Sequence, residues 1–443
     1  MQKAKKENKK AFLKGAITIA TGGFIAKLIG ALYRIPLTNL IGGRGIGLYQ
    51  LVYPVYCLLL TVSATGIPSS IAKLTAERGE KGGRAVFKTA MKLFLIIGGV
   101  GTLLMVLLAP LLARAQGSEG VLFGYYALAP SVFLVSAISV FRGWFQGRNE
   151  MRPTALSEIT EQLVKVGFGL LFAYLFQGNV ERAVVFLLLS VSLSEAVALF
   201  LMLALYKRVP APTISKNDGG RVAMKTVLKL SIPVTLSSIL LPTSSLIDSV
   251  LAVRLMRAYA TDAVALYGLF SGGAVTMINL PVSIAYGIAV SSVPSVAKAQ
   301  TRKERKKRIF FALGLTAVLG LASAVALYFF ASPAVRIVFR SLKEEEAETL
   351  IGLVKALSVS ALTLSLVQTL SACLTAQGKP QYSALSMLIA VVVKTATYVF
   401  LLRDAQISVF GLATATNLCY LVAFFLDLVY NLVINKRQKG ETP

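Results

Sequence analysis

Twelve apolar stretches of about twenty residues or more constrain this chain more than any other feature of its sequence. They cover residues 12–41, 46–67, 89–113, 121–143, 155–177, 183–205, 226–256, 264–292, 309–331, 350–375, 383–402 and 407–433. A helix of about 20 apolar residues crosses a hydrocarbon core of roughly 30 Å, whereas barrel strands are shorter and alternate in polarity. Since only 15% of the residues are charged, the sequence predicts an all-α integral membrane protein with about twelve transmembrane helices.

Lysine and arginine are distributed unevenly over the segments between these stretches. The N-terminal segment and every second segment after it hold 31 of the 46 basic residues, the alternate segments hold ten, and five lie inside the stretches. Because cytoplasmic loops are enriched in Lys and Arg, we expect both termini to be cytoplasmic and the basic N-terminus to be an uncleaved anchor. The net charge of +26 therefore indicates membrane topology and not nucleic-acid binding, since the spans separate the basic clusters.

The residue types that most catalysis requires are missing. The chain has no histidine, which excludes histidine metal sites and histidine-based nucleophilic catalysis. Cys57, Cys373 and Cys419 lie in apolar runs without metal-ligand spacing, so neither a zinc site nor a disulfide framework is expected. The sequence also has no phosphate-binding loop and no long polar segment that could form a catalytic domain. We expect a transporter without a cofactor, not an enzyme, powered by the membrane potential or a Na⁺ or H⁺ gradient.

The polar segment 206–225 divides the chain into two halves with six apolar stretches each. We expect a basic cytoplasmic N-terminus (1–11), six-helix bundles at 12–205 and 226–433, a cytoplasmic linker between them and a cytoplasmic tail (434–443). Six is an even number, so both halves enter the membrane from the same side and are related by a pseudo-twofold axis along the membrane normal. Two such bundles can rock against each other around a central cavity.

Weak internal similarity indicates that the halves arose by duplication. The string QGRNEMRPTALS (146–157) resembles QGKPQYSALS (377–386), and each string opens an apolar stretch. When the shared ALS is aligned, Lys165 and Lys394 occupy corresponding positions. The two lysines are therefore expected at similar places in the two bundles.

Several strings of the sequence resemble a known family. They include GLYQLVYPVY (47–56), GIPSSIAK (66–73), SIPVTLSSILLPTSSLIDSVLAVRL (231–255) and the segment 265–299. They are similar to the stage V sporulation protein B and polysaccharide-exporter branch of the multidrug/oligosaccharidyl-lipid/polysaccharide flippase superfamily, which also contains the lipid II flippases. The resemblance extends over nearly the whole chain.

The resemblance implies a monomeric flippase of the bacterial cytoplasmic membrane, surrounded by membrane lipids. Its substrate would be an anionic polyprenyl-diphosphate glycolipid, either an undecaprenyl-diphosphate-linked oligosaccharide or a peptidoglycan precursor. Alternating access would move it for cell-wall, spore-cortex or polysaccharide synthesis. Lipid II flippases and most sporulation relatives have fourteen helices, whereas this sequence predicts twelve, so the resemblance assigns no groove for the lipid tail. The alternative in the same superfamily is a cation-coupled multidrug exporter, although the first stretch has no acidic residue that could couple a cation.

Charged residues inside the apolar stretches are the candidate site, because a charge within the bilayer costs several kcal/mol unless it is paired or hydrated. In the first stretch, Lys27 and Arg34 are seven residues apart and share one helix face. Both suit a diphosphate, and arginine adds a bidentate geometry. The alternative is that Lys27 snorkels and Arg34 anchors the outer interface.

The seventh stretch combines several serines with Asp248 and is interrupted by Pro233 and Pro242. Prolines free backbone carbonyls in a membrane helix, so we expect this stretch to move. The resemblance implies that Asp248 pairs with a cavity cation or takes part in ion coupling. Arg254 lies six residues later, about 240° further around the helix, and is a candidate for substrate binding or for interface anchoring.

The remaining candidates are charged residues in four further stretches. Glu161 precedes Lys165 by four residues, the spacing of a favourable pair within one helix. Lys394 has Ala390 where that glutamate would stand, so it needs another partner or an anionic ligand. Glu195 and Asp427 are candidate charge-pair partners or ion-coupling groups. None of these residues forms a metal-ligand pattern.

Overall fold

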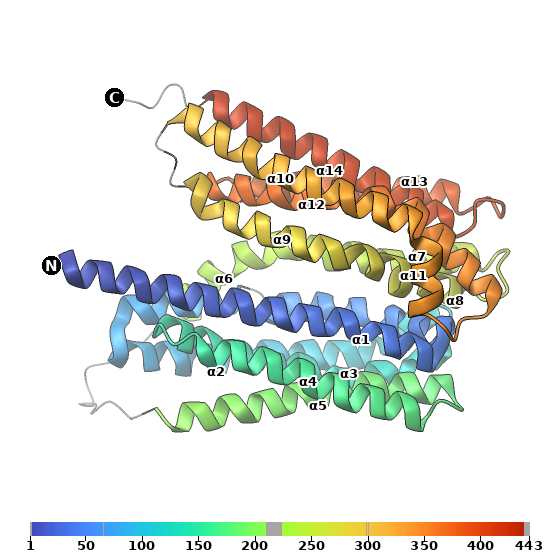
Figure 1. The fold of residues 1–443 in the computed structure, drawn as a ribbon. Coiled ribbons are helices and arrows are strands. Elements are labelled where there is room, and N and C mark those ends of the chain that lie inside the picture. Colours follow the sequence, from blue (N-terminus) through green and yellow to red (C-terminus); the bar gives the residue numbers. More distant parts are fainter. Residues whose placement is uncertain (1, 65, 210–223, 298, 300, 438–443) are drawn as a thin grey trace. The chain divides into compact units, whose positions relative to one another are not determined.

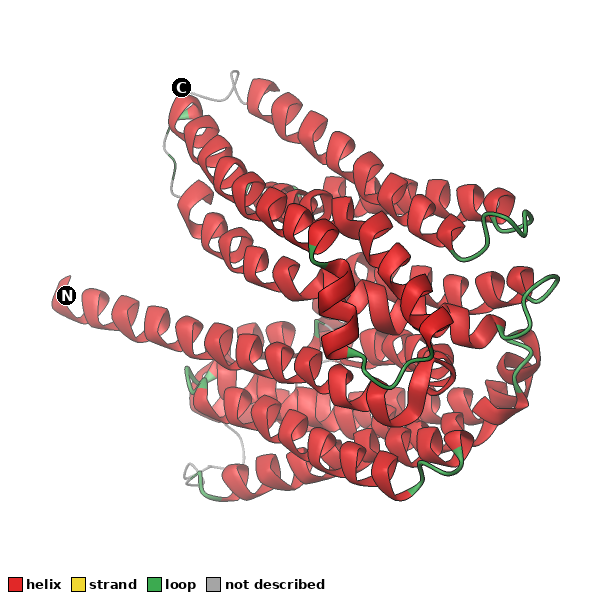
Figure 2. Cartoon of the chain, turned by 45° about the vertical axis from the view of Figure 1, so that its right-hand side comes forward, coloured by secondary structure: helices red, strands yellow, loops and turns green. Residues whose placement is uncertain are grey.

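The computed structural model describes residues 2–64, 66–209, 224–297, 299 and 301–437, and the side chains of some residues within these helices lie outside that description. The described residues form helices joined by short turns and include no strand (Figure 2). This confirms the all-α membrane fold that the apolar stretches predict.

The N-terminal part of the chain forms the first six α-helices (Figure 1). They are α1 (Gln2–Ala64), α2 (Ile67–Ala115), α3 (Leu122–Gly147), α4 (Arg152–Leu175), α5 (Val180–Lys207) and α6 (Met224–Ser238), and a short η1 (Glu119–Val121) precedes α3. Two of them are bent at glycines with positive φ. In α1 the bend is at Gly42 (φ 67°, ψ −176°), and in α2 it is at Gly79 (φ 65°, ψ −166°). Because this region of backbone space is almost restricted to glycine, each glycine ends one straight segment and starts the next.

The C-terminal part of the chain forms the remaining helices. They are α7 (Leu240–Met256), α8 (Ala263–Gly268), η2 (Leu269–Ala274), α9 (Val275–Ala297), α10 (Arg302–Phe329), α11 (Ala331–Val338), α12 (Glu344–Ala376), α13 (Pro380–Leu401) and α14 (Phe410–Arg437). The π-helical η2 connects α8 to α9 without a loop. The short α11 lies in the polar segment between two apolar stretches.

Nine segments of the described chain are long and apolar enough to cross a membrane. The twelve predicted spans are compatible with these nine segments, because three features of the helices lower the number of segments that qualify. The first two stretches merge across Gly42, the helix α4 carries several charges, and the seventh stretch is split into α6 and α7 at Ile239. The bend at Ile239 lies between the two prolines that the sequence singled out.

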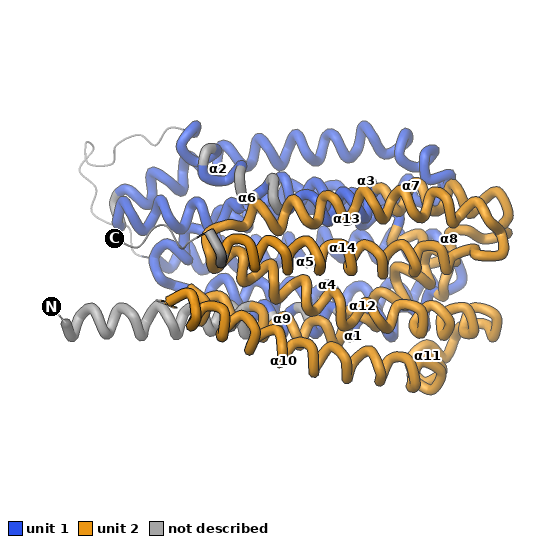
Figure 3. The backbone as a smooth tube through the Cα atoms, turned by 90° about the horizontal axis from the view of Figure 1, so that it is seen from above, with its two compact units in different colours: residues 1–41, 51–246 blue, residues 42–50, 247–443 orange. Residues whose placement is uncertain are grey.

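The chain divides into two compact units (Figure 3). Unit 1 consists of residues 1–41 and 51–246, and unit 2 of residues 42–50 and 247–443. The predicted linker 206–225 lies largely outside the described residues, so its role stays a prediction, as does the division into bundles at 12–205 and 226–433.

Unit 1 is held together by an aromatic cluster and by small residues. The rings of Phe87, Trp144 and Tyr206, from α2, α3 and α5, pack with centroids 4.7–5.9 Å apart. A Cβ on Gly143 would lie 2.8 Å from the backbone of Pro68, so α3 approaches α2 closely only because this residue is glycine. Close packing over small residues is typical of helix association in lipid.

Unit 2 is built around α12, which packs against α9, α10 and α14. Polar side chains join these helices: the Thr316 and Thr369 hydroxyls are 2.9 Å apart, and the Ser360 hydroxyl donates to Asn417 at 2.6 Å. Hydrogen bonds of this kind fix the register of helices in a membrane.

Candidate functional site

Arg34 and Lys165 bring two cations together inside unit 1. Arg34 lies on α1 and Lys165 on α4, and both side chains are half-buried. The two helices lie against each other, since a Cβ on Gly30 of α1 would lie 3.1 Å from the Gln162 amide oxygen of α4. The fold therefore places together two of the basic residues that the sequence proposed for substrate binding, although they are 131 positions apart.

Glu161 is paired with Arg142 and not with the lysine one turn along its own helix. The Arg142 guanidinium donates from Nη2 to Glu161 Oε2 at 3.0 Å and from Nε to Ser157 Oγ at 2.9 Å. The pairing of Glu161 with Lys165 was therefore wrong as an ion pair, because α3 supplies a planar donor that reaches both α4 side chains. Lys165 still feels the charge of Glu161, and also that of Glu195.

Glu195 lies on α5 and is 1% exposed. The Tyr56 hydroxyl, from α1, donates to Glu195 Oε1, and within the described part of the chain Oε2 has no hydrogen-bond partner. A salt bridge, which the sequence proposed for this residue, is not formed among the described side chains. The carboxyl is thus held by a neutral hydroxyl next to the cations of unit 1.

The side chain of Lys27 lies outside the described residues, but its helix passes close to α4. A Cβ on Gly22 would lie 2.7 Å from the Cβ of Ala155, and one on Gly30 would lie 3.1 Å from the Gln162 amide oxygen. The glycines of α1 therefore allow the helix that carries Arg34 to lie against the helix that carries Lys165.

Asp248 and Lys394 form a buried ion pair in unit 2. The Lys394 ammonium, from α13, donates to Asp248 Oδ2 on α7, and the two residues are 8% and 6% exposed. Asp248 Oδ1 has no hydrogen-bond partner among the described groups. Lys394 and Asp248, each of which was expected to have a partner of opposite charge, are thus partners of each other.

Arg254 lies at the C-terminal end of α7 and is exposed. Asp427, on α14, is 1% exposed and accepts a hydrogen bond from the Ser371 hydroxyl at 2.7 Å. Neither residue joins the pair of Asp248 and Lys394 within the described contacts. The described residues contain no group of three or more His, Cys, Asp or Glu side chains that could hold a metal ion.

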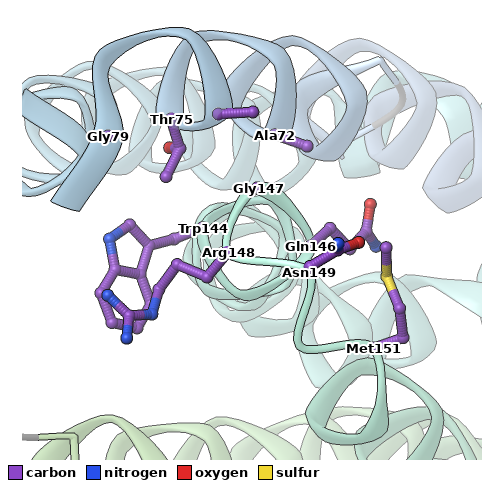
Figure 4. A pocket seen from close by; sticks show the side chains of 10 residues that line it. Ala72, Thr75, Gly79, Trp144, Gln146, Gly147, Arg148, Asn149 and Met151 are labelled. Carbon is purple, nitrogen blue, oxygen red and sulfur yellow. The ribbon is translucent and has the colours of Figure 1, made fainter. Parts of the chain in front are cut away.

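A pocket of about 540 Å³ lies in unit 1, between α2 and the turn from α3 to α4. Figure 4 shows Trp144 and Arg148 against each other on one side, with Gln146, Asn149 and Met151 on the other. The Arg148 guanidinium lies 4.9 Å from the centre of the Trp144 ring. This pocket is not among the sites predicted from the sequence. The signal that could have found it is the single tryptophan of the chain, which precedes a basic turn.

The fold, the membrane-spanning helices and the charges within them define a transporter of the membrane and not a soluble protein. Residues 12–286 match the model of the polysaccharide biosynthesis protein family. The chain belongs to this family and, within the multidrug/oligosaccharidyl-lipid/polysaccharide flippase superfamily, to the branch of the stage V sporulation protein B. The resemblance seen in the sequence is thereby confirmed.

Two curated relatives are similar to this chain in sequence, and one solved structure is similar to it in fold. The stage V sporulation protein B of Bacillus subtilis is 27% identical over 350 residues, which cover 75% of this chain and 68% of that protein. The lipid II flippase MurJ of the same organism is 23% identical over 461 residues, covering 97% and 83%. An inward-facing multidrug resistance MATE transporter matches the fold with a TM-score of 0.80 at 17% identity, over 97% of this chain and 100% of that chain.

Proposed function

We propose that this protein is a flippase that moves an undecaprenyl-diphosphate-linked oligosaccharide or peptidoglycan precursor across the cytoplasmic membrane by alternating access. The observation that carries the proposal is that Arg34 and Lys165 lie on α1 and α4, two helices that lie against each other at the glycines of α1. A diphosphate placed near both would be attracted by two positive charges, and arginine could bind it with two parallel hydrogen bonds. The names of the sequence relatives support a lipid-linked substrate.

The proposal requires an orientation, which we infer from the basic residues. If the α12–α13 turn faces the cytoplasm, a cysteine at Gln381 in a cysteine-free background is shielded from an impermeant thiol reagent in intact cells. One at Glu345 is labelled. Both positions are exposed in the structure. Labelling in the reverse order would overturn the orientation.

Transport in liposomes tests the function directly. Vesicles containing the purified protein, fluorescent lipid II and an unrelated undecaprenyl-diphosphate glycan would be scored for which lipid becomes accessible in the opposite leaflet. We expect one or both lipids to cross. Ser365→Ala, which leaves the charged residues intact, is the control variant. Absence of any glycolipid movement in vesicles with folded protein would contradict the proposal.

The second candidate is a cation-coupled multidrug exporter, which the fold similarity to a MATE transporter supports. Because Arg34 and Lys165 together repel a cationic drug in a region of low dielectric constant, we rank it below the flippase. Drug efflux by vesicles that move no glycolipid would reverse this ranking.

A further inference from the structure

The polar side chains around Asp427 form a chain of hydroxyl groups. Ser383 Oγ, on α13, donates to Ser371 Oγ on α12 at 2.6 Å, and Ser371 Oγ donates to Asp427 Oδ2 on α14 at 2.7 Å. Ser386, also on α13, donates instead to the Tyr382 carbonyl of its own helix at 3.0 Å. Three helices thus contribute to one hydrogen-bonded group that ends at a carboxyl.

Among the described side chains, no cation lies within ion-pair distance of the Asp427 carboxyl. It is 1% exposed, it forms no ion pair among the described residues, and its Oδ1 has no hydrogen-bond partner there. An isolated carboxylate in such a place is far less stable than the neutral acid, because the interior cannot replace its hydration. A bound proton removes the charge without any further ligand.

The ionisable groups of the packed helices do not change this conclusion. The rings of Tyr382 on α13 and Tyr430 on α14 are tilted against each other with centroids 4.9 Å apart. Lys394 lies eight residues beyond Ser386 on α13 and is paired with Asp248. Cys373 of α12 faces Ser292 of α9. Hydroxyls, and no charged side chain, therefore face Asp427 from α12 and α13 in the described structure.

The serine chain leads from the buried acid to the surface of unit 2. Ser371 and Ser383 are half-buried, whereas Gly378, Lys379 and Pro380 in the turn between α12 and α13 are exposed. A hydroxyl both donates and accepts a hydrogen bond, so a row of them can pass a proton by successive rotation. The row connects Asp427 to the end of the unit where this turn lies.

We propose that Asp427 is a proton-binding site that exchanges with water at the α12–α13 turn through Ser371 and Ser383. Acidification on that side fills the site and alkalinisation empties it. The site belongs to unit 2 alone and is separate from the cations of unit 1. Its use to drive transport rests on the proposed function, whereas the exchange of the proton does not.

Infrared difference spectra of the purified protein test the site without any substrate. We expect the wild type to show the carbonyl band of a protonated carboxylic acid that titrates with pH, and Asp427→Asn to lose this band. Ser383→Ala should keep the band but slow its exchange in deuterated water. Ser365→Ala is the control, because this buried α12 serine donates to the Ala361 carbonyl and not toward Asp427, and it should match the wild type.

Three results would overturn the inference: a band unaffected by Asp427→Asn, a carboxylate signal at every pH, or a spectrum that responds to Na⁺ at constant pH. Asn is close in shape to the neutral acid, so a melting temperature near that of the wild type shows that Asp427→Asn still folds. Glycolipid flipping driven by a pH gradient is measured afterwards. If no glycolipid moves in any variant, the proposed function fails while the spectra still decide the proton site.

Discussion

In unit 1 the charged side chains within the helices form a group drawn from several helices, whereas in unit 2 two of them close into one buried pair. Arg34, Arg142 and Lys165 come from three helices of unit 1, and Arg142 and Glu161 retain 14% and 19% exposure. The side chains of Asp248 and Lys394, taken without their backbone atoms, are only 8% and 10% exposed. Partly hydrated cations can receive an anion, while a dry pair mainly holds two helices together. If the proposed function holds, we expect unit 1 to bind the substrate and the ion pair between α7 and α13 to have a structural or switching role.

The largest effect should come from breaking the pair in unit 2. Lys394→Met leaves the buried Asp248 without its cation, so we expect the free energy of unfolding to fall by about 3–5 kcal/mol. Thermal unfolding in detergent measures this. Asp248→Asn combined with Lys394→Met removes both charges and should recover much of the loss. Equal destabilisation of the single and double variants would mean that the pair is not what holds α7 to α13.

The next effect concerns the anion site of unit 1. Arg34→Ala should lower glycolipid flipping by at least about tenfold, because a hydrogen bond to a charged group contributes about 1.5–3 kcal/mol. Arg34→Lys should recover part of it, since the charge remains but the planar fork is lost. Flipping is measured in liposomes, with melting temperature as the check on folding. Full transport by Arg34→Ala would reassign this residue to anchoring at the interface.

Glu161→Gln sharpens the comparison by adding net positive charge to unit 1. Without the Glu161 carboxylate, less negative charge offsets the positive charges of Arg142 and Lys165. The apparent affinity for the diphosphate lipid should therefore rise by about fivefold, or about 1 kcal/mol. The melting temperature should fall slightly because the bond to Arg142 weakens. Measuring KM and the maximal rate separately distinguishes the two effects. A weaker affinity would place the substrate away from α4.

The smallest effect is expected on the surface of unit 2. Arg336 on α11 is held by Glu344 at 2.7 Å and Glu348 at 2.6 Å, but all three side chains are about half exposed or more. Water and salt screen such pairs, so Glu344→Gln should leave the melting temperature and flipping unchanged. A large loss of stability would show that exposure alone does not separate structural pairs from weak ones in this chain.

The spans were predictable from the sequence, and the pairing of charges was not. Hydropathy is a property of consecutive residues, so it locates the spans. The break near Ile239 was also predictable, because Pro233 and Pro242 interrupt the same stretch. Asp248 and Lys394 were both named, but their pairing depends on how α7 and α13 pack, which no local pattern encodes. Arg142 was not among the candidates named from the sequence, and its reach to Glu161 appears only once α3 and α4 lie side by side. The same holds for the pocket beside Trp144.

The backbone passes between the two units three times, after Ile41, after Gln50 and after Leu246. Any displacement of one unit against the other must therefore be accommodated by rotation about a few bonds at these three crossings. Gly42 stands at the first of them, in a conformation that other residues adopt only at a cost of about 1–3 kcal/mol. Since nothing lies within 4 Å of where its Cβ would be, the requirement for glycine comes from backbone torsion and not from crowding. The chain thus has a backbone conformation that requires glycine at its first passage from unit 1 to unit 2.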